Sequence, residues 1–227
     1  MVGFNNLSNL ITDSYVNLDE SNKFLVSKEE LAKRSDGLIA LSGGIYGDLA
    51  NSIRTGDDDL INSSIKYWKK NFPESFYIEI TRTGKDFEDE YISYAIDISE
   101  KHNIPIVASN DVRFINKKDY QAHEVRVCIN DGSYLKDEKR KSEYNENQYL
   151  KSSEEMQELF SDIPAAVENS CEIAKRCNVQ LSLGDTAMPI FPLENSQNEN
   201  EYFESLVKLS LNKNCLLYTS DAADEGL

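Results

Sequence analysis

The sequence predicts an α/β fold with a parallel sheet. Three short apolar runs, at residues 37–41, 76–80 and 104–108, are separated by segments whose apolar residues recur at helical spacing. Apolar residues fill both faces of the run at 104–108, as expected for a strand that is covered on both sides. Strands that alternate with helices are typical of βαβ units, in which helices cover a parallel sheet.

The composition is that of a globular, acidic protein. The chain has 227 residues, of which 40% are hydrophobic and 28% charged, and its net charge is −16. This length is enough for one sizeable domain, or for one domain and the start of another. A surface of this sign repels a phosphate backbone, so we do not expect this segment to hold DNA.

The expected location is the cytoplasm, without membrane contact. The sequence has no run of about eighteen apolar residues and no basic and apolar leader. Its four cysteines form no C-x-x-C pair, which favours reduced thiols over a disulfide or a zinc site.

Helices and strands alternate over the first 130 residues. Leu60 is expected to share a buried face with Ile61, Ile65 and Trp68, and Tyr94 is expected on the buried stripe of a later helix. The predicted elements are, in order, an amphipathic helix from Leu7 to Tyr15, a short helix opened by a capping box at 27–30, the strand at 37–41, a turn at 42–44, helices at about 46–54 and 57–71, the strand at 76–80, a helix at about 86–102, the strand at 104–108 and a helix near 118–129.

The last third of the chain changes character. Residues 131–149 are rich in polar side chains and predict a long surface loop. A capping box at 152–155 opens one helix, and Pro164 starts another that runs to about Cys177, with Asp162 as its expected cap. The remainder predicts an extended connector at 188–192, a polar linker at 195–200 and the start of a helix at 201–211.

Polar side chains gather where two of the predicted strands end. The run at 104–108 is followed by Ser109, Asn110, Asp111 and Arg113, and the run at 76–80 is followed by residues 81–84. In barrel-type α/β folds, the carboxyl ends of the strands carry the chemistry. These two segments are therefore the candidate site.

Three blocks of the sequence together resemble the PHP (polymerase and histidinol phosphatase) domain of bacterial replicative DNA polymerase III alpha subunits. The blocks are residues 37–44, 104–132 and 149–179, and the likeness runs in the same order over nearly all of residues 3–210. The resemblance implies an incomplete, distorted parallel β/α barrel, of which the chain holds roughly the later two-thirds.

The resemblance also implies a division of the chain. Residues 1–187 correspond to the C-terminal part of a PHP domain, and residues 188–214 to a connector and a first helix towards the polymerase region. The H-x-H motif of the family would precede this segment, and the acidic residues of the polymerase palm would follow it. Residues 215–227 are expected to be a sequencing-adapter scar, because codons for residues 215–225 reproduce a transposase adapter read in frame.

Two positions at which the family has metal-binding histidines are changed. The family's R-H-G is Arg82-Thr83-Gly84 here, and its D-x-H is Asp111-Val112-Arg113. A hydroxyl is a weak ligand and a guanidinium cannot bind a metal ion, so Asp111 alone keeps a ligand-capable side chain. We therefore expect Thr83, Asp111 and Arg113 to form a degenerate site, in which Arg113 pairs with Asp111 or with neighbouring carboxylates. No metal, cofactor or catalytic residue is expected in this chain, whereas Mg²⁺ is expected for the polymerase domain of the parent protein.

Other polar residues have structural interpretations. His102 is expected to be exposed near a helix end, and His123 to make a structural hydrogen bond instead of ligating a metal. Residues 42–44 lack the lysine of a P-loop, which favours a tight strand-to-helix turn over a phosphate site. Residues 57–59 complement the dipole of the helix that follows.

The resemblance implies a role in DNA replication, as part of a DNA-directed DNA polymerase. The PHP portion would be metal-free and would serve as structural support and as a docking platform for the proofreading exonuclease, among other replicase subunits. The alternative is an active metal-dependent phosphoesterase, either a 3′–5′ exonuclease or a pyrophosphatase. A free-standing enzyme similar to histidinol phosphatase is disfavoured by the polymerase-like block at 149–179.

Overall fold

The computed structural model describes residues 1–17, 24–137, 140, 142–181, 183–184, 186, 189, 191–193 and 198–213. It divides into two compact units, Met1–Gln180 and Leu181–Leu227. The expected adapter scar at 215–227, residues 195–197 of the expected linker and residues 188 and 190 of the expected connector lie outside the described residues.

The first unit is built on a parallel sheet with the strand order β1-β2-β3. The strands are β1 (Ala40–Leu41), β2 (Phe76–Thr81) and β3 (Ile106–Ser109). Ala40 pairs with Phe76, and Ile78 pairs with Ile106. The predicted α/β class is confirmed. The incomplete, distorted parallel β/α barrel stays a prediction, because the described strands form a three-stranded sheet.

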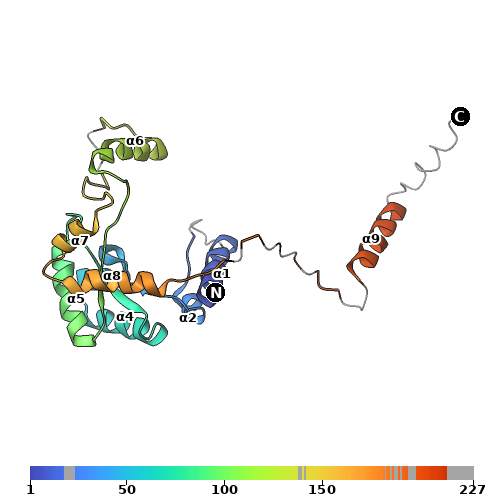
Figure 1. Ribbon diagram of the computed structural model, residues 1–227, viewed down its shortest axis with the longest axis horizontal. Helices are drawn as coiled ribbons and strands as arrows, with labels where there is room; N and C mark the ends of the chain where they lie inside the picture. The colour runs from blue at the N-terminus through green and yellow to red at the C-terminus, as the bar shows by residue number, and fades with distance from the viewer. Residues whose placement is uncertain are drawn as a thin grey trace. The chain divides into compact units, whose positions relative to one another are not determined.

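Helices connect and cover the strands (Figure 1). Those of the first unit are α1 (Val2–Val16), α2 (Lys28–Lys33), α3 (Asp48–Thr55), α4 (Asp58–Asn71), α5 (Glu88–His102), α6 (Tyr120–Asp131), α7 (Ser153–Leu159) and α8 (Pro164–Arg176), with 3-10 turns η1 (Gly44–Tyr46) and η2 (Lys117–Asp119). The second unit contains α9 (Glu199–Lys213), which begins two residues before the predicted start. Each helix predicted from the sequence is confirmed.

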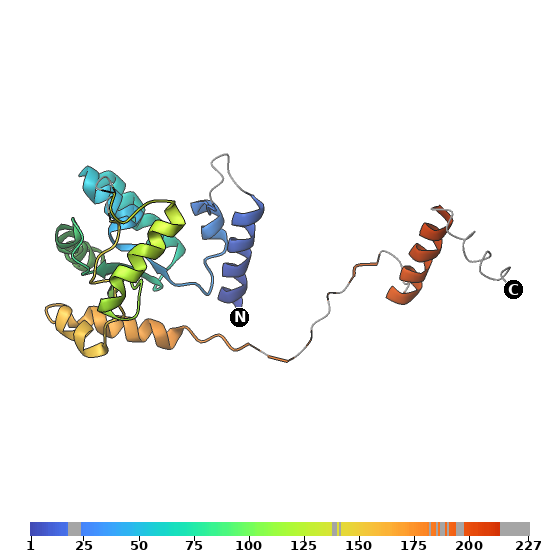
Figure 2. The same ribbon diagram turned by 90° about the horizontal axis from the view of Figure 1, so that it is seen from above.

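The core lies between the sheet and the helices around it. α8 packs against β3 and α5 against β2, while α3 and α4 pack on each other. Figure 2 shows α8, in orange, along one side of the unit and α3 and α4, in blue and cyan, along the other. The largest fully buried apolar side chains are Tyr91, Phe160, Leu49, Ile78 and Ile80.

Local hydrogen bonds fix the starts of the helices. The Ser27 hydroxyl accepts from the amide of Glu30, and a complete capping box joins Ser152 and Glu155. Pro164 occupies the first turn of α8 as predicted. The prediction of Asp162 as the cap is wrong, because its carboxylate accepts instead from the Arg82 guanidinium.

Two side chains that were expected to be buried are exposed. Leu60 is 49% exposed and Tyr94 is 45% exposed. Successive residues of a helix differ by about 100° in direction, so Leu60 points well away from the stripe formed by Ile61 and Ile65. Tyr94 lies at the edge of the stripe centred on Tyr91 for the same reason.

The first strand is shorter than predicted. Residues 37–39 do not pair with β2, because Gly37 adopts a left-handed conformation with φ of +72°. The amide of Leu38 then donates to the carbonyl of Ser35, which forms a turn before the strand begins at Ala40. Within the described ranges, no helix combines the length and the apolar character that crossing a membrane requires.

Candidate functional site

A cavity of about 400 Å³ lies at the carboxyl ends of β2 and β3. The turn after β1, the loop after β2 and the loop after β3 line it together. Its lining residues include Gly43, Gly44, Tyr46, Glu79, Thr81, Thr83, Lys85, Glu88, Ser109, Asn110, Asp111 and Arg113. The structure thus brings together all three of the residues predicted from the family positions, Thr83, Asp111 and Arg113.

Asp111 lies between two cations. Its Oδ1 is 2.7 Å from Nη2 of Arg113, and its Oδ2 is 3.4 Å from Nζ of Lys85. Burial alone would lower the pKa of Lys85. The Lys85 ammonium donates hydrogen bonds to the Tyr46 hydroxyl and to Asp111, and these outweigh burial and raise its pKa. Of the two kinds of partner expected for Arg113, the structure shows Asp111. Lys85 is a further partner of Asp111 that the sequence did not predict.

Thr83 belongs to a different hydrogen-bond group. Its side chain is buried, and its hydroxyl donates to Oε1 of Glu88 at 2.7 Å. The amide groups of Thr83 and Gly84 donate to Oε2 of the same carboxylate. Glu88 begins α5, so this helix anchors the loop that carries Thr83.

Part of the segment 131–149 packs against Asp111 and Arg113 and is not a surface loop, contrary to the prediction. Gln148 is fully buried, and its amide donates to Oδ2 of Asp111 at 2.7 Å. Its carbonyl accepts from the amide of Arg113, and Phe114 forms a parallel bridge with Tyr149. The ring of Tyr144 lies 5.0 Å from the Arg113 guanidinium, in cation–π geometry.

The floor of the cavity is hydrogen-bonded to the strands. The Ser109 hydroxyl donates to Oε1 of Glu79 at 2.5 Å, and the amide of Glu79 donates to the hydroxyl of Ser42. Ser42 is also 3.0 Å from the phenol of Tyr91, whose pKa burial raises to about 12. At neutral pH this phenol is therefore a neutral structural group and cannot serve as a base.

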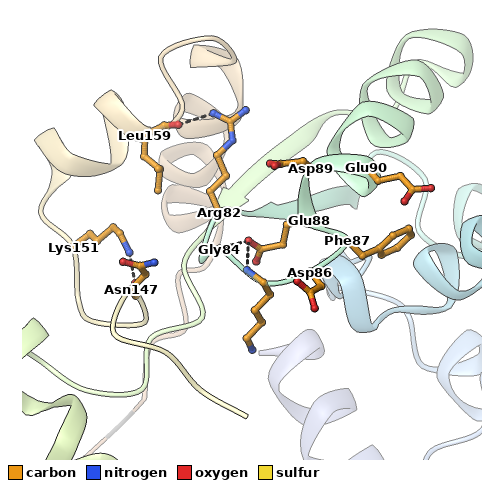
Figure 3. Close-up of a pocket in the computed structure, with 11 residues that line it drawn as sticks. Arg82, Gly84, Asp86, Phe87, Glu88, Asp89, Glu90, Asn147, Lys151 and Leu159 are labelled. Carbon is orange, nitrogen blue, oxygen red and sulfur yellow. Dashed lines mark hydrogen bonds between the residues drawn. The ribbon is translucent and has the colours of Figure 1, made fainter. Parts of the chain in front are cut away.

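A second cavity of about 690 Å³ adjoins the first (Figure 3). On its wall, Arg82 donates to the carbonyl of Leu159 at 2.6 Å and to both oxygens of Asp162 at 2.6 and 2.7 Å. These hydrogen bonds of the Arg82 guanidinium connect the end of β2 to the segment between α7 and α8. Burial lowers the pKa of Lys151, whose ammonium donates to Asn110 at 3.2 Å.

The histidines differ from their predicted environments. His102 is half-buried instead of exposed, and burial together with Lys101 and Lys69 lowers its pKa. The His123 ring packs 5.5 Å from Phe114 and 4.9 Å from Tyr144. Its buried Nε2 has no hydrogen-bond partner in the described part of the chain, so the hydrogen bond expected for His123 is not found at this atom.

Two other sequence interpretations are refined. Residues 42–44 form the predicted tight turn, with Gly43 in the left-handed region at φ of +79°. Asp57 does more than complement a dipole, because its Oδ1 accepts from the amides of Asp59 and Leu60.

The side chains of the first cavity do not fit a metal centre. Asp111 is engaged by two cations, and both oxygens of Glu88 already accept hydrogen bonds. A fixed guanidinium beside the remaining ligand repels a metal ion. Across the described ranges, no three His, Cys, Asp or Glu side chains form a group that could hold one.

Comparisons with known proteins agree with the resemblance seen in the sequence. The PHP domain family matches residues 1–83. The DNA polymerase III subunit alpha of Escherichia coli K12 is 40% identical over 198 residues, which cover 87% of this chain and 17% of the relative. The subunits of that name from Pseudomonas aeruginosa and Vibrio cholerae are 38% and 41% identical, over 88% and 84% of this chain and 17% and 16% of their own lengths. The chain therefore spans about one sixth of the length of these relatives.

Proposed function

We propose that this chain is the PHP region of a replicative polymerase and acts there as a metal-free structural and docking module. The match to the PHP domain family and the similarity to DNA polymerase III alpha subunits over most of the chain support this proposal. In this proposal the whole protein is a DNA-directed DNA polymerase that acts in DNA replication. In this proposal, other regions of the whole protein bind Mg²⁺ and make most of the contacts with DNA.

The pairing of Arg113 with Asp111 is the observation that carries the proposal. The cation stands where the resemblance implies a metal ligand, and it is 2.7 Å from the ligand-capable side chain that remains. A positive charge at this place supplies the attraction for Asp111 that a metal ion would otherwise supply. The site is thus held together without an ion.

The packing around the site supports a structural role. Gln148 and Arg82 connect the strand ends to segments that lie 37 and 80 residues away in the sequence. We further propose that β1, β2 and β3 are consecutive strands of a distorted barrel. Residues 1–187 would then be PHP domain, and residues 188–214 the connector towards the polymerase region.

The proposed partners are the proofreading exonuclease and other subunits of the replicase. The charged side chains of the cavity pair with one another, so we propose that this module binds its partners through its surface and does not catalyse a reaction. The net charge of −16 further favours a protein partner over DNA for this segment.

Metal analysis after dialysis, together with an exonuclease assay, tests the absence of a metal centre. We expect no stoichiometric Zn²⁺ or Mn²⁺ and no phosphoester hydrolysis. The double variant Thr83→His and Arg113→His restores two histidines at the cavity, and Asp111→Asn in the unmodified chain is the matched control. Two tightly held ions in the unmodified chain, lost in Asp111→Asn, would establish the phosphoesterase alternative instead.

A binding titration with the proofreading exonuclease tests the docking role. We expect the same affinity with and without EDTA, and little change in the double histidine variant, because both positions lie inside the cavity. Binding that disappears with EDTA, or no binding at all, would remove docking from the proposal and leave the structural role.

A further inference from the structure

The helix α6 turns apolar side chains outward and an ionised side chain inward. Its outward side, called the α6 face below, is formed by the exposed residues Ala122, Val125, Arg126 and Ile129, which share one side because they are three or four positions apart. Ile129 is 78% exposed, whereas Glu124 is 6% exposed. A helix on the surface of a soluble protein normally has the opposite arrangement. The apolar side chains of the α6 face thus lack the contact that such side chains ordinarily make.

Side-chain contacts fix this orientation of α6. Nη2 of Arg140 donates to Oε2 of Glu124 at 2.7 Å, and the hydroxyl of Ser142 donates to the same oxygen at 3.0 Å. The Tyr120 hydroxyl donates to the carbonyl of Tyr144 at 3.1 Å. A rotation that turned the apolar side chains inward would break all of these contacts. The outward direction of the α6 face is therefore built into the fold.

The position of α6 keeps this face accessible. Among the described elements, α6 packs mainly against η2. Figure 1 shows it apart from the helices α4, α5 and α8. The segment that follows α6 adds two more exposed apolar side chains, Tyr134 and Leu135, of which Tyr134 is 80% exposed. Exposed apolar residues that occur together in this way mark interaction surfaces.

The charge around α6 differs from that of the rest of the chain. Residues 112–141 contain eight lysines and arginines and five aspartates and glutamates, whereas the whole chain contains 24 and 40. The ion pair that α6 makes within the described residues joins Glu124 to Arg140. Arg126, on the opposite side of the helix, has no carboxylate partner in that part of the chain. A partner that brought a carboxylate to Arg126 would supply the missing attraction.

We propose that the α6 face docks a protein partner whose surface presents apolar side chains beside carboxylates. Burial of Val125 and Ile129 supplies the affinity, and Arg126 selects the charge of the partner. DNA fits this face less well, because contacts to phosphates come mainly from basic and polar side chains, and Arg126 is the only such residue of the four. The assignment rests on the docking role proposed above and gives that role a location outside the cavity.

A binding titration with the proofreading exonuclease, the partner proposed above, tests the assignment. In Ile129→Ser and in Arg126→Glu we expect roughly tenfold weaker binding, an effect typical of residues at the centre of an interface. Leu60→Ser and Lys66→Glu change exposed residues of α4 in the same way and should leave the affinity unchanged. Circular dichroism should show the same helix content for all four variants, since substitutions of exposed residues rarely disturb folding.

The titration separates the α6 face from the docking role itself. If the exonuclease binds the unmodified chain and both α6 variants equally, the docking role stands and its location on α6 is overturned. The same result is expected if another region of the whole protein covers the α6 face. No binding to the unmodified chain would overturn the docking role and the location together.

Two further measurements address the other possible occupants. Self-association, measured by analytical ultracentrifugation, should not change in Ile129→Ser, and binding of a single-stranded oligonucleotide should not change in Arg126→Glu. A dimer that becomes a monomer in Ile129→Ser would assign the α6 face to a second copy of the chain. Oligonucleotide binding that is lost in Arg126→Glu would assign it to nucleic acid. Either result would overturn the proposal.

Discussion

Two buried glutamates of the same unit are held in different ways. Glu88 is 3% exposed and Glu124 is 6% exposed. The donors of Glu88 include three backbone amides and cover both of its oxygens. Glu124 accepts from Nη2 of Arg140 at 2.7 Å and from the hydroxyl of Ser142 at 3.0 Å, both at Oε2. Its Oε1 has no partner among the residues that the structure describes.

The difference shows how a fold stabilises a buried charge. Backbone amides are fixed once the loop and the helix have formed, so Glu88 gains its donors at little further cost in side-chain entropy. Arg140 and Ser142 must order their own side chains to reach Glu124. A buried charge that depends on one side-chain cation recovers little more than its desolvation costs. Neutralising the two glutamates should therefore have unequal effects.

The largest effect is expected for Glu88→Gln. The amide group of glutamine places N–H donors against donors of the loop, so at least one buried hydroxyl or amide loses its acceptor. We expect a loss of about 3 kcal/mol in the free energy of unfolding, since each unsatisfied buried group costs about 1–3 kcal/mol. Urea unfolding measures it, with Glu90→Gln as the exposed control. A loss no larger than that of Glu124→Gln would remove the distinction between the two sites.

Local pattern was enough to predict most of the fold. Helical spacing, the serine caps at Ser27 and Ser152, and Pro164 mark helix starts through contacts within a few residues. Two features were less predictable. The exposure of Leu60 depends on its direction at the edge of the buried helix face, and the length of β1 depends on the single left-handed residue Gly37.

Only part of the site could be predicted. Asp111 and Arg113 are two residues apart, and their opposite charges made this pair one of the two predicted alternatives for Arg113. The burial of Gln148 against Asp111 depends on a contact across 37 residues, which no local pattern contains. The role of Glu88 was missed, although the sequence contained a signal. A glutamate in the first turn of a helix can accept hydrogen bonds from the hydroxyls and amides of a preceding loop that contains two threonines and a glycine.

In the described part of the chain, the Asp48 carboxylate accepts hydrogen bonds only from side chains, but from more of them than Glu124 does. Its contribution to the free energy of unfolding should depend on pH. Burial alone would raise its pKa, but hydrogen bonds from Lys28 at 2.5 Å and Ser64 at 2.7 Å, and from Trp68, outweigh burial and lower it. A lowered pKa stabilises the fold above the unfolded value of about 3.9, and the contribution is lost as pH falls through the folded value.

For Asp48→Asn we expect a loss of about 1 kcal/mol at neutral pH, since the carboxylate is partly exposed and screened by solvent. The difference from the unmodified chain should shrink as the pH falls below about 4. Urea unfolding across this range measures it. Asp58→Asn, in the exposed first turn of α4, is the control and should show a smaller change. A difference that grows in acid would contradict the lowered pKa.

A smaller effect is expected for Arg82→Lys. The Arg82 guanidinium donates to both oxygens of Asp162 and holds the pKa of that carboxyl below its usual range. Lysine keeps the charge and loses the two-pronged geometry. Asp162 is largely exposed, so we expect a loss of less than about 1 kcal/mol in thermal or urea unfolding. Arg126→Lys, at an exposed position of α6, is the control, and an equal loss there would show that this geometry is not needed.

The smallest effect is expected for Glu124→Gln. Glutamine keeps the volume of the side chain and an acceptor for Ser142, while it removes a buried charge whose Oε1 lacks a partner in the described ranges. The lost attraction to Arg140 and the avoided desolvation of the carboxylate should nearly cancel, leaving a change of about 0.5 kcal/mol or less in either direction. Arg140→Ala should be more damaging than Glu124→Gln, because it leaves the buried carboxylate without its cation. If urea unfolding instead shows that Glu124→Gln is as harmful as Glu88→Gln, side-chain donors hold a buried charge as well as backbone donors do, and the contrast between the two glutamates fails.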